Sequence, residues 1–560
     1  MAINRIRLLH SLSIVILCTA ILSILLIEII LNLTPPIDRD ALIHHLAIPK
    51  LWLKNGGFYE MKWAVFSYYP MNVDLLYLIP VYFNKDFIAK FIHMGFGIGT
   101  ALLIYHYLSR KINYIAGLLG ILVFLSTPMI VRLSMEAYVD LGLIFFTTAS
   151  MIAFIHYRDG EYKDFKWLFL SSVAMGIALG TKYNALIAWF FLSTAIVFVY
   201  SRNTGEQWKA IKCGSIFFLI SLAVFSPWLI KNYILTGNPL YPLLQGIFSI
   251  TDTSVQEGTR SISGGTYSGI FQTREVMYGE NFWETLFIPI RYFFQGQDDN
   301  FRYFDGVLNP ILIIFSPFAF MNKSFYRDKL FFTGFTIFFV LTATFLDQTR
   351  IRYILPVVPI LSILSVMGVI NILNWIMNLS VYFKNIITAV VLLIFVIFIS
   401  NNFFYIKKYY QNISPMNYIS GKESRDAFIS RHVGSYPAMN FINQFTPENA
   451  KIRLILLAGR GYYLDRIYEA DSSMGMAFIS SLVRASSDDI TFQKHIDSLD
   501  YTHLLLRIDL FYKFLQDNYS TETTKQFLQQ LKRSTEIIYN ANGYAVVRLI
   551  PERKPLPQNQ

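Results

Sequence analysis

The sequence contains few cysteines and few charged residues for its length. Its two cysteines, Cys18 and Cys213, both fall inside apolar runs, where a free cysteine is typically a small hydrophobic residue. A disulfide framework and a cysteine zinc site are therefore excluded. Only 15% of the 560 residues are charged, whereas a soluble protein carries about a quarter. This shortage of charge indicates a membrane protein.

A nucleotide-binding motif is also missing. No GxGxxG or P-loop pattern opens a predicted helix, and the GRG at residues 459–461 is too short to indicate one. The net charge of +11 does not indicate nucleic acid, because basic residues typically flank the cytoplasmic ends of membrane helices. We therefore expect no nucleic-acid partner.

The sequence contains long apolar runs without charged residues. A helix needs about 20 residues to cross the hydrocarbon core, and residues 353–383 and 385–405 carry no charge at all. The first apolar run continues to Leu33 without a cleavage site, so we expect an uncleaved first helix. Apolar runs and their breaks predict an α-helical polytopic membrane protein with about 11 transmembrane helices, at residues 8–33, 87–109, 114–131, 138–157, 167–181, 183–201, 213–231, 308–321, 329–346, 353–376 and 385–405.

The basic residues predict the orientation of these helices. With the N-terminus inside, most lysines and arginines between the helices fall on the inner side, as at Arg110, Arg158 and Lys384. The short outer turns receive only Arg132, Lys182, Arg350 and Arg352. This bias fixes the N-terminus inside. An odd number of helices then places everything after about residue 405 outside.

Two long loops are predicted on the outer side, at about residues 34–86 and 232–307. The first contains two semi-apolar pieces, Leu42–Leu53 and Val73–Phe83, which are too short to cross a membrane. They are typical of helices that lie in the membrane interface. The aromatic run Phe66–Met71 suits the same depth.

The composition becomes that of a soluble domain from about Gln411 onward. Strand-like runs alternate with helical stretches, the former at residues 453–458, 503–508 and 545–550 and the latter at 438–445, 492–499 and 523–532. This alternation predicts an α/β domain. We therefore divide the chain into a transmembrane domain at residues 1–410 and an extracytoplasmic α/β domain at residues 411–560.

Charged residues gather at the predicted outer ends of the helices. Charge at membrane depth is costly and is usually functional. Carboxylates can act as general bases, and cations can hold a phosphate, so the set suits a phosphorylated, membrane-embedded substrate. The alternative is that these side chains form interfacial salt bridges or snorkel to the headgroups. The set comprises Asp38, Arg39, Asp40, Arg132, Glu136, Asp140, Lys182, Lys231, Asp347, Arg350 and Arg352.

Several segments resemble one known group of enzymes. They are IDRDALIHHLAIPKLWLKNGG (Ile37–Gly57), FSYYPMNVDLLY (Phe66–Tyr77), EAYVDLGLIFF (Glu136–Phe146), GTKYNALIAW (Gly180–Trp189), PWLIKNYILTGNPLYP (Pro227–Pro242) and QTRIRYILPVVP (Gln348–Pro359). In this order they resemble lipid-carrier-dependent glycosyltransferases of the GT-C fold. The resemblance covers most of residues 30–360. It extends to the bacterial relatives of protein O-mannosyltransferases and of aminoarabinose transferases, a group like glycosyltransferase family 39.

The resemblance implies a catalytic acid in the first outer loop. Many relatives carry an Asp-Glu pair there, whereas this chain has Asp38-Arg39-Asp40-Ala41. We favour Asp40 as the base, because residues 40–46 best match the run that follows the usual acid, and Asp38 is the alternative. The candidate substrate-binding residues are His44, His45, Tyr69, Glu136, Asp140, Lys182, Arg350 and Arg352.

The implied reaction moves a sugar from a polyprenyl phosphate to a hydroxyl or amine on the outer face, with inversion at the anomeric carbon. The acceptor is a glycan, a lipid or a protein, and the location is a bacterial inner (plasma) membrane. Lys182, Arg350 and Arg352 would stabilise the phosphate leaving group. No cofactor is certain, although Asp38, Asp40 and Glu136 could supply oxygen ligands for a divalent metal. A lipid-linked glycan transporter or flippase, and a glycan polymerase or ligase, are the alternatives.

Overall fold

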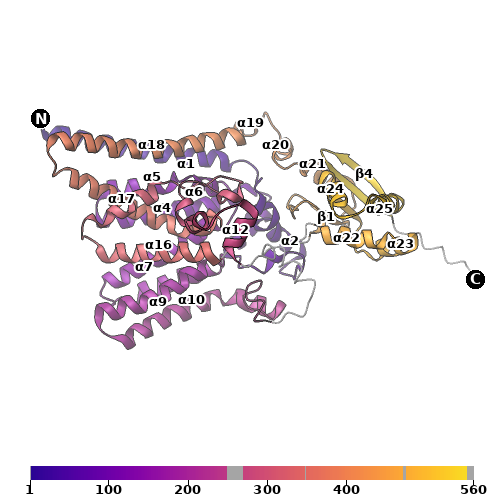
Figure 1. Cartoon of the computed structure of the whole chain (residues 1–560), viewed down its shortest axis with the longest axis horizontal. Helices are drawn as coiled ribbons and strands as arrows, with labels where there is room; N and C mark the ends of the chain where they lie inside the picture. The colour runs from indigo at the N-terminus through magenta and orange to yellow at the C-terminus, as the bar shows by residue number, and fades with distance from the viewer. Residues whose placement is uncertain (1, 249–268, 347–348, 471–474, 551–560) are drawn as a thin grey trace, which may run out of the picture.

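The computed structural model describes residues 2–248, 269–346, 349–470 and 475–550. These residues form a long helical bundle and a smaller C-terminal domain built around a sheet, which lies beyond one end of the bundle (Figure 1). The first and last long helices of the bundle, α1 (Ala2–Asn32) and α18 (Val381–Ile413), lie side by side in Figure 1 and contact each other.

Each of the eleven predicted apolar segments is helical. Eight helices in the described residues are long and apolar enough to cross a membrane, and a bent pair makes up to nine. The polytopic fold is thus confirmed, with eight or nine full-length spans rather than eleven. The other segments of the bundle are α4 (Phe87–Lys111), α5 (Tyr114–Leu125), α6 (Pro128–Ser134), α7 (Asp140–Asp159), α8 (Phe165–Leu179), α9 (Ala185–Thr204), α10 (Gln207–Thr236), α15 (Ile311–Ile314), η4 (Ser316–Met321), α16 (Tyr326–Leu346), η5 (Ile351–Val357) and α17 (Val358–Ile376).

Two local features explain the lower number of spans. Helices α5 and α6 meet at an angle of 73°, because Pro128 at the start of α6 has no N–H to continue the α5 ladder. Helix α8 has only 15 residues, and the apolar stretch Ile311–Met321 is shorter still. A straight crossing of the hydrocarbon core needs about 20 residues.

One end of the bundle is closed by a compact ionic network. Lys111 at the end of α4 pairs with Asp159 at the end of α7 at 2.8 Å. Arg158 pairs with Asp328 near the start of α16, and the Tyr107 hydroxyl donates to Asp328 at 2.6 Å. The sequence analysis assigns the basic residues of this network to the inner side, and the structure brings them together at one end of the bundle.

The first outer loop is helical at the opposite end of the bundle. It forms η1 (Ala41–His45), α2 (Ala47–Asn55), η2 (Val65–Tyr68) and α3 (Asn72–Tyr82). The two semi-apolar pieces are therefore helices, and one face of each is buried, although Leu76, Ile79 and Tyr82 of α3 remain exposed. The described part of the second outer loop contains α12 (Ile270–Tyr278), α13 (Phe282–Leu286), α14 (Ile288–Arg291) and η3 (Phe301–Tyr303).

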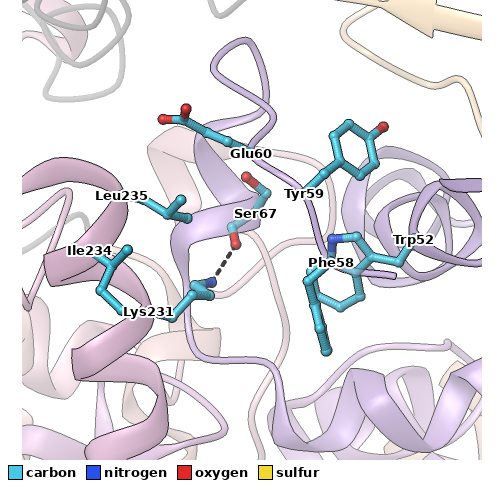
Figure 2. A pocket seen from close by; sticks show the side chains of 8 residues that line it. All are labelled: Trp52, Phe58, Tyr59, Glu60, Ser67, Lys231, Ile234 and Leu235. Atoms are coloured by element: carbon cyan, nitrogen blue, oxygen red, sulfur yellow. Dashed lines mark hydrogen bonds between the residues drawn. The ribbon is translucent and has the colours of Figure 1, made fainter. Parts of the chain in front are cut away.

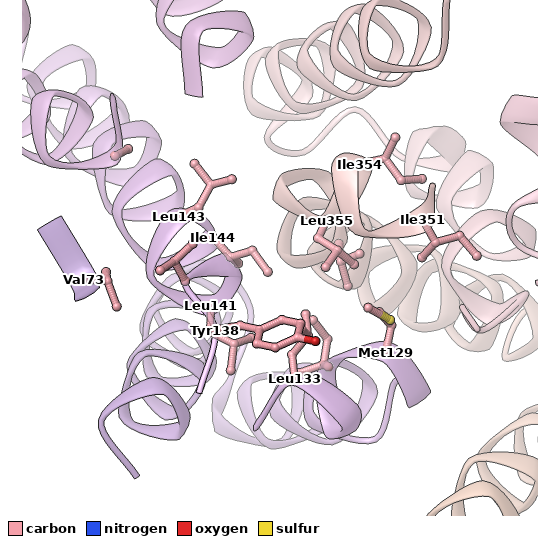
Figure 3. Packing of buried hydrophobic residues seen from close by; sticks show 14 of the residues in the cluster. Val73, Met129, Leu133, Tyr138, Leu141, Leu143, Ile144, Ile351, Ile354 and Leu355 are labelled. Atoms are coloured by element: carbon pink, nitrogen blue, oxygen red, sulfur yellow. The ribbon is translucent and has the colours of Figure 1, made fainter. Parts of the chain in front are cut away.

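A cluster of buried apolar residues packs beneath these outer segments. Leu133 of α6, Leu141 and Ile144 of α7, and Leu355 of η5 are buried in one cluster with Tyr138 at its centre (Figure 3). Close packing of this kind fixes the ends of α6, α7 and η5 relative to one another. The charged residues at or beside these helix ends are consequently held in place.

The C-terminal domain contains a five-stranded sheet in the order β2-β1-β3-β5-β4. The first three strands in this order are parallel, and β5 pairs antiparallel with β3 and β4. Asn542 and Gly543 have positive φ and form the tight turn between β4 and β5, as an Asn-Gly pair favours. The strands are β1 (Lys451–Ile455), β2 (Ile467–Glu469), β3 (His503–Arg507), β4 (Thr535–Ala541) and β5 (Tyr544–Leu549).

The predicted elements of this domain are present, and others join them. The three strand-like runs correspond to β1, β3 and β5, and the three helical stretches correspond to α21, α23 and α25. Strands β2 and β4 were not predicted. The helices are α19 (Pro415–Ile419), α20 (Arg425–His432), α21 (Tyr436–Phe445), α22 (Met476–Ala485), α23 (Asp489–Ser498), α24 (Ile508–Asn518) and α25 (Thr521–Ser534).

Candidate functional site

A chain of four charged side chains joins the outer ends of distant segments. We call Asp40, Arg352, Asp140 and Lys182 the ionic chain. Arg352 Nη1 lies 2.6 Å from Asp40 Oδ2, and its Nε lies 3.8 Å from Asp140 Oδ1. Lys182 Nζ lies 2.6 Å from the same Asp140 oxygen. The structure thus brings together four residues that the sequence selects from four separate segments.

The ionic chain is largely withdrawn from solvent. The Asp140 side chain is 1% exposed, whereas that of Asp40 is 21% exposed and is the most accessible of the four. Burial would raise the pKa of Asp40, but the charge of Arg352 and its hydrogen bond lower that pKa well below the ordinary value. Asp40 is therefore an ionised carboxylate at neutral pH, at the open end of the chain.

Two histidines lie beside Asp40 in η1. His45 Nδ1 and Asp74 Oδ1 of α3 are 2.7 Å apart. Burial lowers the pKa of His45 to about 3 and raises the pKa of Asp74 to about 7. The His44 ring stacks on Phe66 with centroids 4.3 Å apart. Burial also lowers the pKa of His44 well below its ordinary value, so both imidazoles are neutral.

Tyr138 connects the first outer loop to α7. Its hydroxyl accepts a hydrogen bond from the Asp40 backbone N–H at 3.3 Å, and its carbonyl accepts one from the Tyr77 hydroxyl. The Arg352 guanidinium lies 5.2 Å from its ring centroid. The sequence analysis did not select Tyr138 or Asp74. The position of Tyr138 between Glu136 and Asp140 was the available signal.

Asp38 and Glu136 belong to a second acidic region next to the ionic chain. Arg132 Nε lies 3.0 Å from Glu136 Oε1, and Arg132 also contacts Asp298 at 3.1 Å. Burial raises the pKa of Asp38 to about 6, although the charges of Lys90 and Arg132 oppose the rise. Within the described residues, no group of three His, Cys, Asp or Glu side chains is arranged to hold a metal ion. The suggested oxygen site of Asp38, Asp40 and Glu136 is therefore not formed, because Glu136 turns to Arg132.

Two other predicted binding residues lie at the edge of this region. The Arg350 guanidinium lies over the Phe301 ring of η3, 4.7 Å from the ring centroid. Among the described residues, Arg350 makes no contact with the ionic chain. The Tyr69 ring contacts Phe66 and Tyr183 edge-on, at 5.5 and 5.4 Å. Asp347, which the sequence groups with these charges, lies outside the described residues.

Several buried polar atoms of the site lack a hydrogen-bond partner within the described chain. Buried polar groups are normally satisfied, so a group of unsatisfied atoms indicates a place where a substrate or water binds. They lie on three different segments around Asp40. These atoms are His44 Nδ1, Glu136 Oε2, Asp140 Oδ2 and Arg352 Nε.

A separate cavity of about 180 Å³ lies between the first outer loop and the end of α10. Lys231 of α10 lines it and donates to the Ser67 carbonyl at 2.7 Å (Figure 2). Its walls are mainly aromatic and aliphatic, and no member of the ionic chain lines it. The ionic chain and this cavity are therefore separate candidate sites. The cavity is lined by Trp52, Phe58, Tyr59, Glu60, Ser67, Lys231, Ile234 and Leu235.

Comparisons with known proteins identify a family model and solved structures to which this chain is similar. The family model described as dolichyl-phosphate-mannose-protein mannosyltransferase matches residues 57–236. That match includes Glu136, Asp140 and Lys182. A search of curated proteins finds no match to the sequence.

Solved structures are similar over nearly the whole chain. ArnT from Cupriavidus metallidurans bound to undecaprenyl phosphate is 16% identical with a TM-score of 0.53, and the match covers 95% of this chain and 97% of that chain. Its apo state is 15% identical with a TM-score of 0.54, over 96% and 98% of the two chains.

The apo oligosaccharyltransferase of Archaeoglobus fulgidus is 11% identical with a TM-score of 0.51, over 97% of this chain and 75% of that chain. At identities this low, the structural similarity establishes the fold alone. The chain is therefore a multi-pass membrane protein with the GT-C fold, and the resemblance that its sequence shows to glycosyltransferases of that fold is confirmed.

Proposed function

We propose that this protein is a membrane glycosyltransferase that moves a sugar from a polyprenyl-phosphate donor to an acceptor hydroxyl or amine. The observation that carries the proposal is the buried ionic chain, which places a carboxylate, two cations and a second carboxylate in contact at one end of the bundle. Support comes from the mannosyltransferase model over residues 57–236 and from the fold shared with ArnT, whose crystal structure contains undecaprenyl phosphate.

Asp40 is the general base of the proposed reaction. It is ionised, it is the most exposed carboxylate of the ionic chain, and it begins the helical turn that carries His44 and His45. Asp40 takes the proton of the acceptor while the acceptor oxygen or nitrogen attacks the anomeric carbon. The bond between that carbon and the phosphate oxygen breaks as the new bond forms. A single displacement of this kind inverts the anomeric configuration.

Arg352 and Lys182 stabilise the departing lipid phosphate. Each already contacts a carboxylate, so its geometry is fixed before the substrate arrives. Fixed cations beside a developing negative charge lower the barrier without reorganisation. The Arg352 Nε lies 3.8 Å from Asp140 Oδ1 but forms no hydrogen bond among the described residues, so we assign it to a phosphate oxygen. In the same proposal, the unsatisfied His44 Nδ1 binds a sugar hydroxyl.

The location and partners follow from the same proposal. The reaction occurs at the outer face of a bacterial inner membrane, where the lipid-linked donor lies in the bilayer. The acceptor is a glycan, a lipid or a protein. The C-terminal domain, at about residues 411–560, lies on the outer side, and Asp38 remains the alternative base.

The proposal is tested with the purified chain in liposomes that contain a polyprenyl-phosphate sugar. We expect release of polyprenyl phosphate and appearance of the sugar on an acceptor, both detected by mass spectrometry. Movement of the intact sugar-lipid between leaflets without cleavage would instead indicate a flippase. Cells that lack the gene supply the candidate acceptors, since the unmodified surface glycan, lipid or protein accumulates in them.

A further inference from the structure

The second outer loop presents an apolar face to its surroundings. Its helices α13 and α14 form one nearly continuous helical segment, because the Phe287 N–H donates to the Trp283 carbonyl and the Arg291 N–H to the Phe287 carbonyl, both at 3.0 Å. Between positions 282 and 294, seven residues are exposed, and Glu284 alone among them is polar. A surface that faces water rarely exposes apolar residues this densely.

Four of the exposed residues share one side of this segment. We call Trp283, Phe287, Ile290 and Phe294 the apolar stripe, since their spacing of four, three and four residues places them on one helix face. Trp283 is 62% exposed, and its ring stacks on Phe287 with centroids 6.1 Å apart. The stripe is therefore one exposed surface rather than a set of scattered side chains.

The charged residues of the same loop are turned inward. The Glu280 side chain is fully buried and pairs with Arg274 at 2.6 Å and with Arg291 at 2.9 Å. A helical segment that faces water buries its apolar side and exposes its charges. This loop does the reverse, which is the arrangement expected of a surface that contacts hydrocarbon.

The segment lies against the outer end of a membrane-spanning helix. Helix α16 is long and apolar enough to cross the membrane, and its Ile337 and Leu341 are exposed. Near its outer end, the Phe345 ring stacks on Phe271 of α12 with centroids 6.1 Å apart, and Phe271 stacks on Phe282 at 5.1 Å. Helix α14 also packs against α16. The stripe is thus placed where α16 leaves the hydrocarbon, the depth that aromatic side chains favour.

The same segment leads into the acidic region next to the ionic chain. After Phe294, the chain reaches Asp298 and Asp305, which pair with Arg132 at 3.1 and 3.5 Å. The Tyr405 hydroxyl of α18 also donates to Asp298 at 2.7 Å. A short segment with several polar contacts therefore connects the stripe to the site.

We propose that the apolar stripe inserts into the membrane leaflet at the ionic-chain end of the bundle, as an interfacial anchor for the segment that pairs with Arg132. Its partner is the boundary between lipid headgroups and acyl chains, into which amphipathic helices bury their apolar face by about 5–10 Å. Phospholipid surrounds α16 at this depth, so it reaches the stripe without a further protein. The inference does not depend on the proposed reaction, because it rests on exposure, ion pairs and packing.

The test places a nitroxide at the stripe. In a chain with Cys18→Ala and Cys213→Ala, Trp283→Cys and Phe287→Cys are labelled one at a time and reconstituted into liposomes of phosphatidylethanolamine and phosphatidylglycerol. Paramagnetic resonance then measures collisions with oxygen, which concentrates in lipid, and with a nickel chelate present on both sides, which stays in water. Both positions should collide with oxygen and be protected from the chelate, as Ile337→Cys on α16 should be.

The matched control is Ile490→Cys on α23 of the C-terminal domain. Ile490 is 65% exposed, close to the value for Trp283, and should show the opposite preference. Chelate access at positions 283 and 287 equal to that at position 490 would overturn the inference. Protection from both reagents with spin–spin broadening would mean that a second copy covers the stripe, and would overturn it as well.

A second measurement needs no cysteine. The emission of the wild type minus that of Trp283→Phe is the emission of Trp283 itself. In liposomes with phospholipid brominated near the headgroup end of its acyl chains, most of this difference should be lost. A difference that brominated lipid leaves unchanged would place Trp283 in water and refute the anchor.

Discussion

Each charge of the ionic chain depends on its neighbour. Asp140 is held by Lys182 at 2.6 Å and faces Arg352 at 3.8 Å. Removing one member of a buried pair leaves its partner without compensation, which is more damaging than removing both. Effects of single substitutions in this chain therefore mix lost chemistry with lost stability. Every activity measurement on these variants needs a parallel measurement of folding, such as the melting temperature in detergent.

Asp40→Asn should reduce kcat by about 10²–10⁴-fold, the usual contribution of a general base. The amide keeps the shape of the carboxylate but cannot accept the proton of the acceptor. Donor binding should change little. Asp38→Asn is the matched control and should retain activity. If Asp38→Asn carries the loss and Asp40→Asn is nearly silent, the base is Asp38 and the mechanism otherwise stands.

The pH dependence of kcat/KM distinguishes the same two carboxylates. A general base works when deprotonated, so activity falls as the pH drops through its pKa. Arg352 holds the pKa of Asp40 below its ordinary value, so the acid limb should lie below about pH 4 if Asp40 is the base. Burial raises the pKa of Asp38 to about 6, and an acid limb near that pH would identify Asp38 instead.

Arg352→Ala should lower kcat/KM by about ten- to a hundredfold, because a hydrogen bond between charged groups is worth about 1.5–3 kcal/mol. It should also move the acid limb to higher pH, because burial then raises the pKa of Asp40 without opposition from Arg352. Arg352→Lys should rescue only in part, since lysine lacks the planar fork. Arg350→Ala should cost less, because Arg350 lies over Phe301; an equal loss in both variants would contradict this assignment.

At the scale of elements, Asn72 joins three helices near the site. Its Oδ1 accepts from Trp228 Nε1 of α10 at 2.8 Å, and its Nδ2 donates to the Ile177 carbonyl of α8 at 3.2 Å. Its own backbone N–H donates to the Gly180 carbonyl at 2.8 Å. A side chain at Gly180 would collide with this junction, since a Cβ there would lie 2.1 Å from Asn72 Nδ2.

Gly180→Ala should therefore destabilise the protein by about 1–3 kcal/mol, the usual cost of overpacking. The expected readout is a lower melting temperature in detergent together with reduced activity, because Gly180 lies two residues before Lys182. Gly95→Ala in α4 is the control, since a Cβ at Gly95 meets no atom within 4 Å. Equal melting temperatures for the two variants would refute the role given to the Asn72 junction.

Elements were predictable where the signal is local. Apolar length alone located each helical segment of the bundle. The bend between α5 and α6 was not predicted, because the apolar run continues through Pro128. Strand β2 has only three residues. Strand β4 lies at the sheet edge with most of its side chains exposed or half-exposed, so it has no buried face and no alternating pattern to recognise.

The site was predictable only as a set of charges at one end of the bundle. The sequence indicates which segments reach the outer side, but pairing depends on the packing of helices that are distant in sequence. Arg352 and Asp40 are 312 positions apart, and Asp74 and His45 are 29 positions apart.

For the whole molecule, the contact between bundle and C-terminal domain is polar as well as apolar. The Tyr463 hydroxyl donates to the Pro36 carbonyl at 2.5 Å. Asp86, just before α4, accepts from Arg425 at 2.6 Å and from the Tyr462 hydroxyl at 3.2 Å. The buried core of the bundle continues into α20 and α21 without a break. The domain is therefore held against the end of the bundle that carries the ionic chain.

The side of the membrane on which this end lies is the remaining prediction. The network of Arg158, Asp159 and Lys111 lies at the end of α7 opposite Asp140, which starts that helix in the ionic chain. Positive residues concentrate on the cytoplasmic side, so the Arg158 end should be inside and the C-terminal domain outside.

A reporter that is active only outside should work when it is fused after Gln560 and should be silent when it is inserted near Arg158. Because α1 and α18 run side by side in the same direction (Figure 1), a fusion just after α18 should behave as the one after Gln560. The reverse pattern would place the ionic chain in the cytoplasm, where a donor in the outer leaflet cannot reach Asp40, and would overturn the proposed reaction together with the topology.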